Sequence, residues 1–313
     1  MKRNLKTNRR LRGAAFFSML LAASLLIGEA GEVLAAKTTP VVVLGGENGS
    51  SSVKDPEPEK PAPSTVTYRK TMVKADDGSV YYYLSSGQMA VNRWVKYKGN
   101  KYYFGSDGKM LKNAWVGNYY VYLNGKRVKN ITKKKVLRKS TKAERRSGKR
   151  LIIVGASRVF HMAEHVSYDK QTVYLCKKGA GIKFLRSDCG PRLCAYLAAF
   201  PHSTVVFQLG NNSLSGYKKK IVKYVNYYQK LMDTFPLANF YFMDALPSKN
   251  KKKNRLRMKF NALLRSAFPA EYIGGYDYMI KSGISFTSDG EHYKPVTSYL
   301  IYDYILKKTG WTS

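Results

Sequence analysis

Four short apolar runs in the second half of the chain predict buried β-strands. The runs lie at 151–154, 172–176, 204–209 and 239–243. Their apolar residues are consecutive, which is typical of parallel strands that are covered on both faces. Segments with helical patterns lie between and after them, at 182–199, 217–234, 255–267 and 295–308. Alternating strands and helices predict a parallel sheet with helices on both faces, occupying residues 150–313.

An aromatic repeat occupies residues 67–130. Tyr81-Tyr82-Tyr83 returns 21 residues later as Tyr102-Tyr103-Phe104, and Trp94 returns as Trp115. A degenerate third copy contains Tyr119-Tyr120 and Asn124-Gly125. The pattern of each unit predicts a strand of aromatic residues, a glycine turn and a return strand. Because a lone hairpin is marginally stable in water, we expect the units to stack on one another.

The first 66 residues predict an exported chain with a flexible tether. Residues 2–12 are basic, residues 14–28 are almost entirely apolar, and a stretch of small residues ends at Ala35-Ala36. This order is typical of a secretory signal peptide at 1–36, and an uncleaved membrane anchor is the alternative. Residues 37–66 are rich in Pro and Ser and alternate in charge, which predicts a disordered tether.

The charge of the chain predicts an anionic partner. Lys and Arg number 55 against 20 Asp and Glu, which is a formal net charge of +35. Since an exported protein rarely meets nucleic acid, we expect an anionic cell-wall polymer, and a membrane only if the signal segment is uncleaved. The basic residues 131–149 are either a solvated linker or a binding segment for that polymer. A second basic run, at 249–259, is expected in or near a loop. Apolar residues make up 44% of the chain, which excludes a wholly disordered protein.

Glycine and polar residues follow the predicted strands, where α/β sheets bind their ligands. Gly155-Ala156-Ser157 follows the first run, and a serine near a helix N-terminus is well placed to be a nucleophile. Gly179-Ala180-Gly181 follows the second, where glycine lets a backbone N–H approach a ligand closely. Asn212 follows the third, and its amide can donate to an oxyanion. Near the C-terminus, Asp289 and His292 have the spacing that lets a carboxylate orient an imidazole.

These four blocks, in this order, resemble the SGNH (GDSL-type) hydrolase family over residues 150–313. The resemblance implies a flavodoxin-like three-layer α/β/α fold and ester hydrolysis through an acyl-enzyme, with no cofactor. It implies a nucleophile, a general base and an orienting carboxylate, namely Ser157, His292 and Asp289. The implied oxyanion donors are the backbone N–H groups of Ser157 and Gly181, with Gly179 as the alternative glycine, and the amide of Asn212.

Two positions depart from the family pattern. Ala156 and Ser213 stand where the family has aspartates that support the hydrogen bonding of the site. Neither position belongs to the triad, so hydrolysis remains possible, with reduced activity or an altered choice of substrate. A binding protein with a catalytically silent SGNH domain is therefore one alternative to an active esterase.

The aromatic repeats resemble the cell-wall-binding repeats of choline-binding and glucan-binding proteins. In those repeats, aromatic residues of neighbouring units form a shallow cage on which a quaternary ammonium group or a sugar face can stack. The candidate carbohydrate- or choline-binding residues are Tyr82, Trp94, Tyr103 and Trp115. The alternative is that these aromatics only form the hydrophobic core of the hairpins.

The remaining histidines carry weaker patterns. His161, Glu164 and His165 match the His-x-x-Glu-His motif of a zinc-protease class. That motif needs a third ligand in a fitting context, and without one we expect no metal. His202 is expected in a solvated loop.

The three cysteines exclude a disulfide-dense scaffold. Cys189 and Cys194 flank a Gly-Pro turn and could form a disulfide in an exported protein, with Cys176 as a buried strand thiol. A fully reduced trio is the alternative.

Together these patterns predict a secreted, wall-associated serine esterase of Gram-positive type. The tether and the repeats would hold the catalytic domain near glycan. The expected reaction is hydrolysis of small acyl esters, such as O-acetyl groups on an envelope polysaccharide. An acyltransferase with the same triad is an alternative, because a sugar hydroxyl can replace water in the second step.

Overall fold

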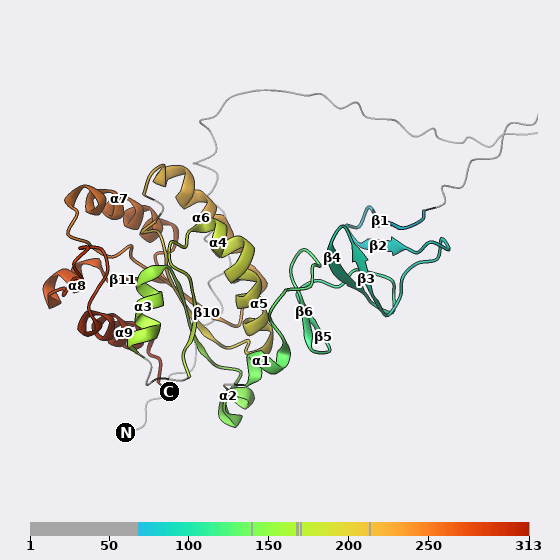
Figure 1. Cartoon of the computed structure of the whole chain (residues 1–313), viewed down its shortest axis with the longest axis horizontal. Coiled ribbons are helices and arrows are strands. Elements are labelled where there is room, and N and C mark those ends of the chain that lie inside the picture. Colours follow the sequence, from blue (N-terminus) through green and yellow to red (C-terminus); the bar gives the residue numbers. More distant parts are fainter. Residues whose placement is uncertain (1–67, 139, 167–168, 170, 213, 313) are drawn as a thin grey trace, which may run out of the picture. The chain divides into compact units, whose positions relative to one another are not determined.

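A five-stranded parallel sheet lies at the centre of the C-terminal domain in the computed structural model, which describes residues 68–312 except 139, 167, 168, 170 and 213 (Figure 1). Its strands are β7 (Leu151–Gly155), β8 (Val173–Cys176), β9 (Thr204–Gln208), β10 (Asn239–Met243) and β11 (Tyr272–Gly274). They lie in the order β11-β10-β9-β7-β8, which is the doubly wound, flavodoxin-like order. The four predicted strands are confirmed, and β11 is too short for a sequence pattern to predict.

The helices cover the two faces of this sheet. They are α3 (Ser157–His165), α4 (Ile182–Phe184), α5 (Gly190–Ala199), α6 (Tyr217–Thr234), α7 (Lys251–Ala267), α8 (Tyr276–Ser282) and α9 (Pro295–Thr309). Figure 1 shows α3 and α9 on one side of the sheet and α5 and α6 on the other. The result is the predicted three-layer α/β/α fold.

Side-chain alternation along β7 divides the core into two clusters. Ile152 and Val154 point into the cluster that contains residues of α5, α6 and α7. Leu151 and Ile153 point into the cluster that contains residues of α3, α8 and α9. Because successive side chains of a strand point to opposite faces, a run of consecutive apolar residues is what such a central strand requires.

The predicted helix at 182–199 is interrupted by a π-helical turn. The turn, η1 (Leu185–Cys189), joins α4 to α5. Gly190 and Pro191 therefore lie inside a helical segment, and the expected Gly-Pro turn between Cys189 and Cys194 is wrong. Pro191 lies in the first turn of α5, where the π-helical turn passes into the α-helix. A Cβ on Gly190 would lie 1.8 Å from the Tyr227 hydroxyl, so α5 packs closely on α6.

All three cysteines are free thiols in the structure. Cys189 and Cys194 are fully buried in the cluster between the sheet and α5, and Cys176 is partly buried at the end of β8. Burial raises the pKa of all three thiols, that of Cys176 to about 11. The reduced alternative is therefore the one that the structure holds.

The second basic run, expected in or near a loop, begins in the loop before α7 (Lys251–Ala267) and continues through the first turns of that helix. Helix α7 begins at Lys251, where the side chain of Asn250 accepts a hydrogen bond of 2.9 Å from the Lys253 N–H. Cations in a first turn are disfavoured by the helix dipole. Here Glu291 offsets that repulsion, because it pairs with both Lys253 and Arg257 at 2.7 Å.

The aromatic repeats form three two-stranded antiparallel hairpins. They are β1–β2 (Thr71–Lys74 and Val80–Tyr83), β3–β4 (Arg93–Tyr97 and Asn100–Phe104) and β5–β6 (Ala114–Val116 and Tyr119–Val121). The sequence predicted a return strand after each glycine turn. In the structure that segment forms only one isolated antiparallel bridge with the preceding strand, as between Phe104 and Met110. Asn92 and Asn113 adopt left-handed φ values of 49° and 51° at equivalent places, a conformation that asparagine tolerates well.

The third hairpin and the predicted basic linker pack against the α/β domain. Tyr120 of β6 is fully buried in the same core cluster as the α5 and α6 residues, and the Tyr122 and Tyr227 hydroxyls lie 2.8 Å apart. Residues 131–149 contain two short helices, α1 (Lys133–Leu137) and α2 (Lys142–Ser147). Thr141 and Glu144 cap α2 reciprocally, so part of this basic stretch is folded.

The predicted signal peptide at 1–36 and tether at 37–66 lie outside the described residues. The described part belongs to one compact unit, Thr65–Ser313. Within that part, none of the helices combines the length and apolar character that a membrane crossing requires.

Candidate active site

Ser157 lies where the central strand β7 ends and helix α3 begins. The last residue of β7 is Gly155, where a Cβ would lie 2.1 Å from the Val159 Cγ2 atom and 2.9 Å from the Gln208 carbonyl oxygen. Glycine at this position lets α3 start directly at the edge of the sheet. The N-cap of α3 is Ala156, so the Ser157 hydroxyl does not serve as a helix cap.

A tight loop before α9 carries Asp289 and His292. The Asp289 Oδ1 atom accepts hydrogen bonds from the Thr287 hydroxyl at 2.7 Å, the Glu291 N–H at 2.8 Å and the His292 N–H at 2.9 Å. These bonds fix the carboxylate within its own loop. Gly290 adopts a φ of +66°, which glycine allows without steric penalty.

The structure brings the three predicted triad residues together. The His292 Nδ1 and Asp289 Oδ2 atoms are 2.5 Å apart, and the His292 Nε2 and Ser157 Oγ atoms are 2.9 Å apart. Hydrogen bonds from His292, and then from Thr287 and Glu291, hold the pKa of Asp289 well below its usual value. An ionised carboxylate can only accept, so Nδ1 carries the proton and Nε2 accepts from the Ser157 hydroxyl.

The glycine block after β8 lies beside Ser157. Gly179 lines the same pocket as Ser157 and His292 and has a φ of +71°. Gly181, the first choice from the sequence, precedes α4 as its N-cap and does not line that pocket. The alternative glycine is therefore the one that lies at the site.

Two asparagines follow β9 at the bottom of the pocket. The Asn212 Nδ2 atom donates to the Ala180 carbonyl oxygen at 3.0 Å, which leaves one amide hydrogen for a ligand. Asn211 was not predicted as a site residue. Its Oδ1 atom accepts from the Arg158 Nη1 atom at 3.2 Å, and its buried Nδ2 atom has no hydrogen-bond partner among the described residues.

Arg158, which the sequence analysis missed, joins three segments of the site. Its guanidinium group is almost fully buried and donates to the Glu291, Leu246 and Pro247 carbonyl oxygens at 3.0, 2.5 and 2.8 Å. Burial lowers the pKa of Arg158 to about 10. A cation in the first turn of a helix opposes the dipole. That unfavourable placement was the one signal in the sequence that Arg158 has a specific partner.

Glu291 is the carboxylate that balances this basic side of the site. It accepts from Lys253 and Arg257 at 2.7 Å, and it lies 3.5 Å from the Arg158 guanidinium group. Partial burial opposes its ionisation, but the hydrogen bonds from Lys253 and Arg257 prevail and lower the pKa of Glu291.

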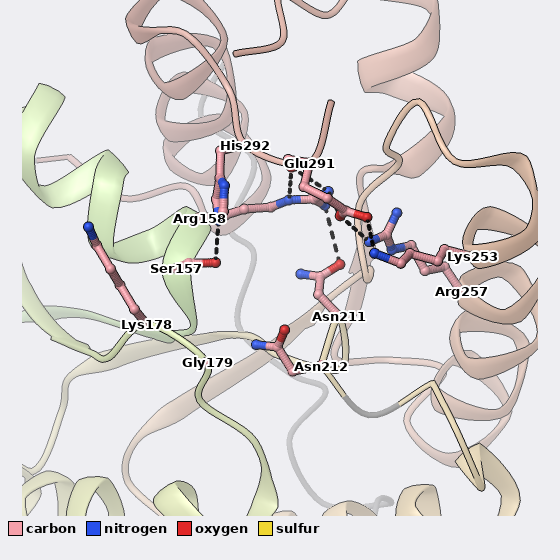
Figure 2. A pocket seen from close by; sticks show the side chains of 10 residues that line it. All are labelled: Ser157, Arg158, Lys178, Gly179, Asn211, Asn212, Lys253, Arg257, Glu291 and His292. Carbon is pink, nitrogen blue, oxygen red and sulfur yellow. Dashed lines mark hydrogen bonds and ion pairs between the residues drawn. The ribbon is translucent and has the colours of Figure 1, made fainter. Parts of the chain in front are cut away.

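A small pocket opens above the Ser157 hydroxyl. It encloses about 270 Å³. Figure 2 shows Lys178 on one side of Ser157 and the Lys253–Arg257–Glu291 group on the other, with the two asparagines between them. A nucleophile, a base and amide donors therefore face one small space, which suits attack on a carbonyl group.

The other predicted histidine cluster has local partners. His161 Nδ1 lies 2.9 Å from the Glu164 carboxylate, and His165 Nδ1 lies 2.8 Å from the Ser298 hydroxyl. Among the residues that the structure describes, no three or more His, Cys, Asp or Glu side chains group in a way that could hold a metal ion. His202 is exposed, as predicted.

The four predicted aromatic ligand-binding residues do not share one site. Trp94 contacts Tyr103, with ring centroids 5.4 Å apart. Tyr82 is instead buried in the repeat core, and Trp115 packs against the core of the α/β domain. The structure adds Tyr119 of the third hairpin to the Trp94 group, with ring centroids 6.1 Å apart and nearly perpendicular planes. Tyr119 belongs to the degenerate third copy and was not predicted as a ligand-binding residue.

Several solved structures are similar to the α/β domain at low sequence identity. A candidate platelet activating factor from Streptococcus pneumoniae is 15% identical over 57% of this chain and 92% of its own, with a TM-score of 0.44. A candidate SGNH hydrolase from Slackia heliotrinireducens is 15% identical over 51% of this chain and 98% of its own, with a TM-score of 0.42.

The repeats match a known family directly. The family model of the choline-binding repeat matches residues 96–127. The solved choline-binding domain of a Streptococcus pneumoniae protein is 36% identical over 18% of this chain and 69% of its own, with a TM-score of 0.17. A search of curated proteins gave no significant match. The resemblance predicted for the repeats is confirmed, and through residues 96–127 the chain belongs to the proteins that carry choline-binding repeats.

Proposed function

We propose that the chain is a wall-attached serine esterase that hydrolyses small acyl esters, such as O-acetyl groups on an envelope polysaccharide. One observation carries this proposal. The Ser157 hydroxyl, the His292 imidazole and the Asp289 carboxylate form a continuous hydrogen-bonded series, with distances of 2.9 and 2.5 Å. The series joins segments 135 residues apart in the sequence, and its geometry is that of a serine hydrolase triad.

The proposed reaction uses each of these groups in turn. Ser157 Oγ attacks the acyl carbon while His292 Nε2 takes its proton, and the Asp289 carboxylate stabilises the resulting imidazolium. The Ser157 and Gly179 backbone N–H groups and the Asn212 amide would donate to the negative oxygen. The imidazolium then gives its proton to the leaving alcohol. Water attacks the acyl-enzyme by the same route, which releases the acid and restores Ser157.

The size of the pocket favours a short acyl group. At about 270 Å³ it lies below the usual range for drug-sized ligands. An acetyl group fits such a space, whereas a long acyl chain would need an extended apolar groove. The lining contains lysines, arginines, asparagines and a glutamate, which favours a polar substrate such as a sugar ester.

Ala156 replaces the family aspartate without leaving a polar gap. It is buried in the apolar cluster that also contains Ala180 and Leu209. The altered position therefore contributes packing beside Ser157, which is compatible with an active triad. Ser213, the other altered position, lies outside the described residues.

The choline-binding repeats support attachment to choline-containing polymers of the cell wall. The Trp94, Tyr103 and Tyr119 rings lie at angles to one another, which suits the recognition of a quaternary ammonium group. Arg127 lies 4.8 Å from the centre of the Tyr119 ring, so one face of that ring already holds a cation. We propose this aromatic group as the attachment site, and secretion follows from the signal peptide expected at 1–36.

Hydrolysis of 4-nitrophenyl acetate tests the proposed activity. We expect Ser157→Ala to lower kcat by at least about 10³-fold, because the nucleophile is removed. Ser187→Ala is the matched control, since the Ser187 hydroxyl is exposed and bonds only to its own helix. Equal rates in the wild type and Ser157→Ala would refute a serine esterase.

Retention on a choline resin tests the attachment separately. Trp94→Ala and Tyr119→Ala should elute at a lower choline concentration than the wild type. Tyr278→Ala is the control, because Tyr278 on α8 has the same 40% exposure as Tyr119 and lies outside the repeats. Unchanged retention of both repeat variants would assign these rings a packing role only.

A further inference from the structure

The pocket beside Ser157 carries an excess of positive charge. Among the residues that line it, four are basic and one is acidic. They are Arg158, Lys178, Lys253, Arg257 and Glu291. One carboxylate cannot balance four cations. A cleft lined mainly by one sign of charge concentrates ligands of the other sign.

The four cations differ in what they can still bind. Arg158 and Arg257 are almost fully buried and are committed to Glu291 and to neighbouring oxygens. Lys253 shares Glu291, but its ammonium group is about half exposed and retains further donors. Lys178 is exposed, lies 4.9 Å from the centre of the Phe160 ring, and has no acidic partner among the described residues. Lys178 and Lys253 are therefore the two cations available to a ligand.

We propose that this site selects esters that carry a negatively charged group, carboxylate or phosphate, on their alcohol part, and that the lysine on the alcohol side of the scissile bond, Lys178 or Lys253, binds that group. The inference rests on the proposed function and specifies its substrate class. Figure 2 shows the two lysines on opposite sides of Ser157, so a cation lies near the alcohol part on whichever of the two sides it binds.

The charge belongs to the alcohol because the acyl group is small. An acetyl group has no ionisable atom, so the anionic group of an acetylated substrate lies on the sugar. The substrate class is therefore an acetylated acidic or phosphorylated sugar. A lysine ammonium suits either anion, since it binds as a point charge with rotatable donors.

Three acetylated sugars on one scaffold test the proposal. They are the methyl 3-O-acetyl glucoside, the corresponding glucuronide and the corresponding glucoside 6-phosphate. Acetate release at low ionic strength should give a kcat/KM about tenfold or more higher for a charged sugar than for the neutral one, since a hydrogen bond to a charged group strengthens binding by at least that order. The difference should shrink in 0.5 M salt, because salt screens exposed charges.

Variants assign the effect to the two lysines. Of Lys178→Gln and Lys253→Gln, the substitution on the alcohol side should lower the ratio of charged to neutral kcat/KM strongly, and the double variant should bring the ratio near one. Lys252→Gln is the matched control, because Lys252 is exposed on the same helix and does not line the pocket. A ratio near one in the wild type, or a ratio that both lysine substitutions leave unchanged, would overturn the proposal.

The failure of this inference differs from the failure of the esterase proposal. Binding of the methyl glucoside, glucuronide and glucoside 6-phosphate to the inactive Ser157→Ala variant is measured by calorimetry, which needs no turnover. Tighter binding of a charged sugar without Ser157-dependent hydrolysis would refute the esterase proposal and support the anion site. Ser157-dependent hydrolysis without a preference for charged sugars would support the esterase proposal and refute the anion site. A preference for the glucuronide or for the phosphate identifies the anion.

Discussion

Replacing Arg158 with methionine should destabilise the protein and slow the reaction together. Methionine keeps most of the apolar stem but removes every donor. Two backbone carbonyl oxygens, those of Glu291 and Leu246, then lose the donor they have in the structure. The Pro247 oxygen keeps the Tyr293 hydroxyl, 2.5 Å away. The Asn211 Oδ1 atom also loses its bond from the Arg158 Nη1 atom. The substitution therefore removes the donor of three acceptors.

The size of the effect follows from these three acceptors. Each buried polar group left without a partner costs about 1–3 kcal/mol, whereas Glu291 keeps its ion pairs with Lys253 and Arg257. Arg158 is 5% exposed, so solvent can replace few of its bonds. We expect the free energy of unfolding to fall by about 3–5 kcal/mol, a large part of the usual total of about 5–15 kcal/mol.

Urea denaturation and kinetics of 4-nitrophenyl acetate hydrolysis measure the two effects. The Glu291 carbonyl directly precedes His292, so loss of Arg158 should lower kcat by about tenfold or more with a smaller change in KM. Arg158→Lys keeps the charge but reaches fewer acceptors, and its effects should be intermediate. It also provides a folded variant if Arg158→Met does not fold. Arg255→Met, on the exposed face of α7, is the matched control.

A specific result would refute this reasoning. One refuting result is a free energy of unfolding for Arg158→Met that lies within about 1 kcal/mol of the wild-type value, together with an unchanged kcat. The carbonyl oxygens would then have found other donors. Arg158 would then have no positioning role. If stability falls while kcat of the folded variant is unchanged, Arg158 supports the fold but not the alignment of His292.

Three further predictions concern the glycine before the nucleophile, the acidic residue of the triad and the thiols. Gly155→Ala should lower both stability and activity, because the new Cβ would meet Val159 and a β9 carbonyl oxygen. A second substitution, Val159→Ala, should restore them only partly, since the carbonyl oxygen remains. Thermal unfolding and kcat/KM measure the two effects. Asp289 has a lowered folded pKa, so its contribution to stability is present above pH about 4 and is lost as the pH falls through that pKa. The deficit of Asp289→Asn in urea titrations should therefore be constant from pH 7 to 5 and shrink in stronger acid, and a deficit independent of pH would contradict this. All three thiols should react with Ellman's reagent in urea without a reductant and should react slowly in the native protein, since burial raises their pKa values. A count of one reactive thiol in urea would instead indicate a disulfide.

The sequence alone predicted the parts of this protein that depend on local pattern. Consecutive apolar residues marked the central strands, because a strand covered on both faces has no polar side. The spacing of the aromatic repeat indicated the hairpins, and the order of the four blocks indicated the residues that surround Ser157. These signals are carried by neighbouring residues, so no knowledge of distant contacts was needed to find them.

Other features depended on partners that the sequence does not mark. The third hairpin contains Trp115 at the repeat spacing, yet it packs on α5 and α6, so that Trp115 contributes to the core of the α/β domain. The basic run at 249–259 was expected in or near a loop, and in the first turns of α7 its cations Lys253 and Arg257 pair with Glu291, some 40 residues away. In both cases a long-range contact outweighs the local preference.

The sequence by itself therefore determined which residue types the site contains and which segments carry them. Only the tertiary structure decided their geometry: that Ser157 and His292 meet at 2.9 Å, that Gly179 lines the pocket while Gly181 does not, and that Arg158 holds the triad loop. The physical reason is that the ends of parallel strands converge at one edge of the sheet. Side chains that follow different strands become neighbours there, and their hydrogen bonds depend on distances that no local pattern contains.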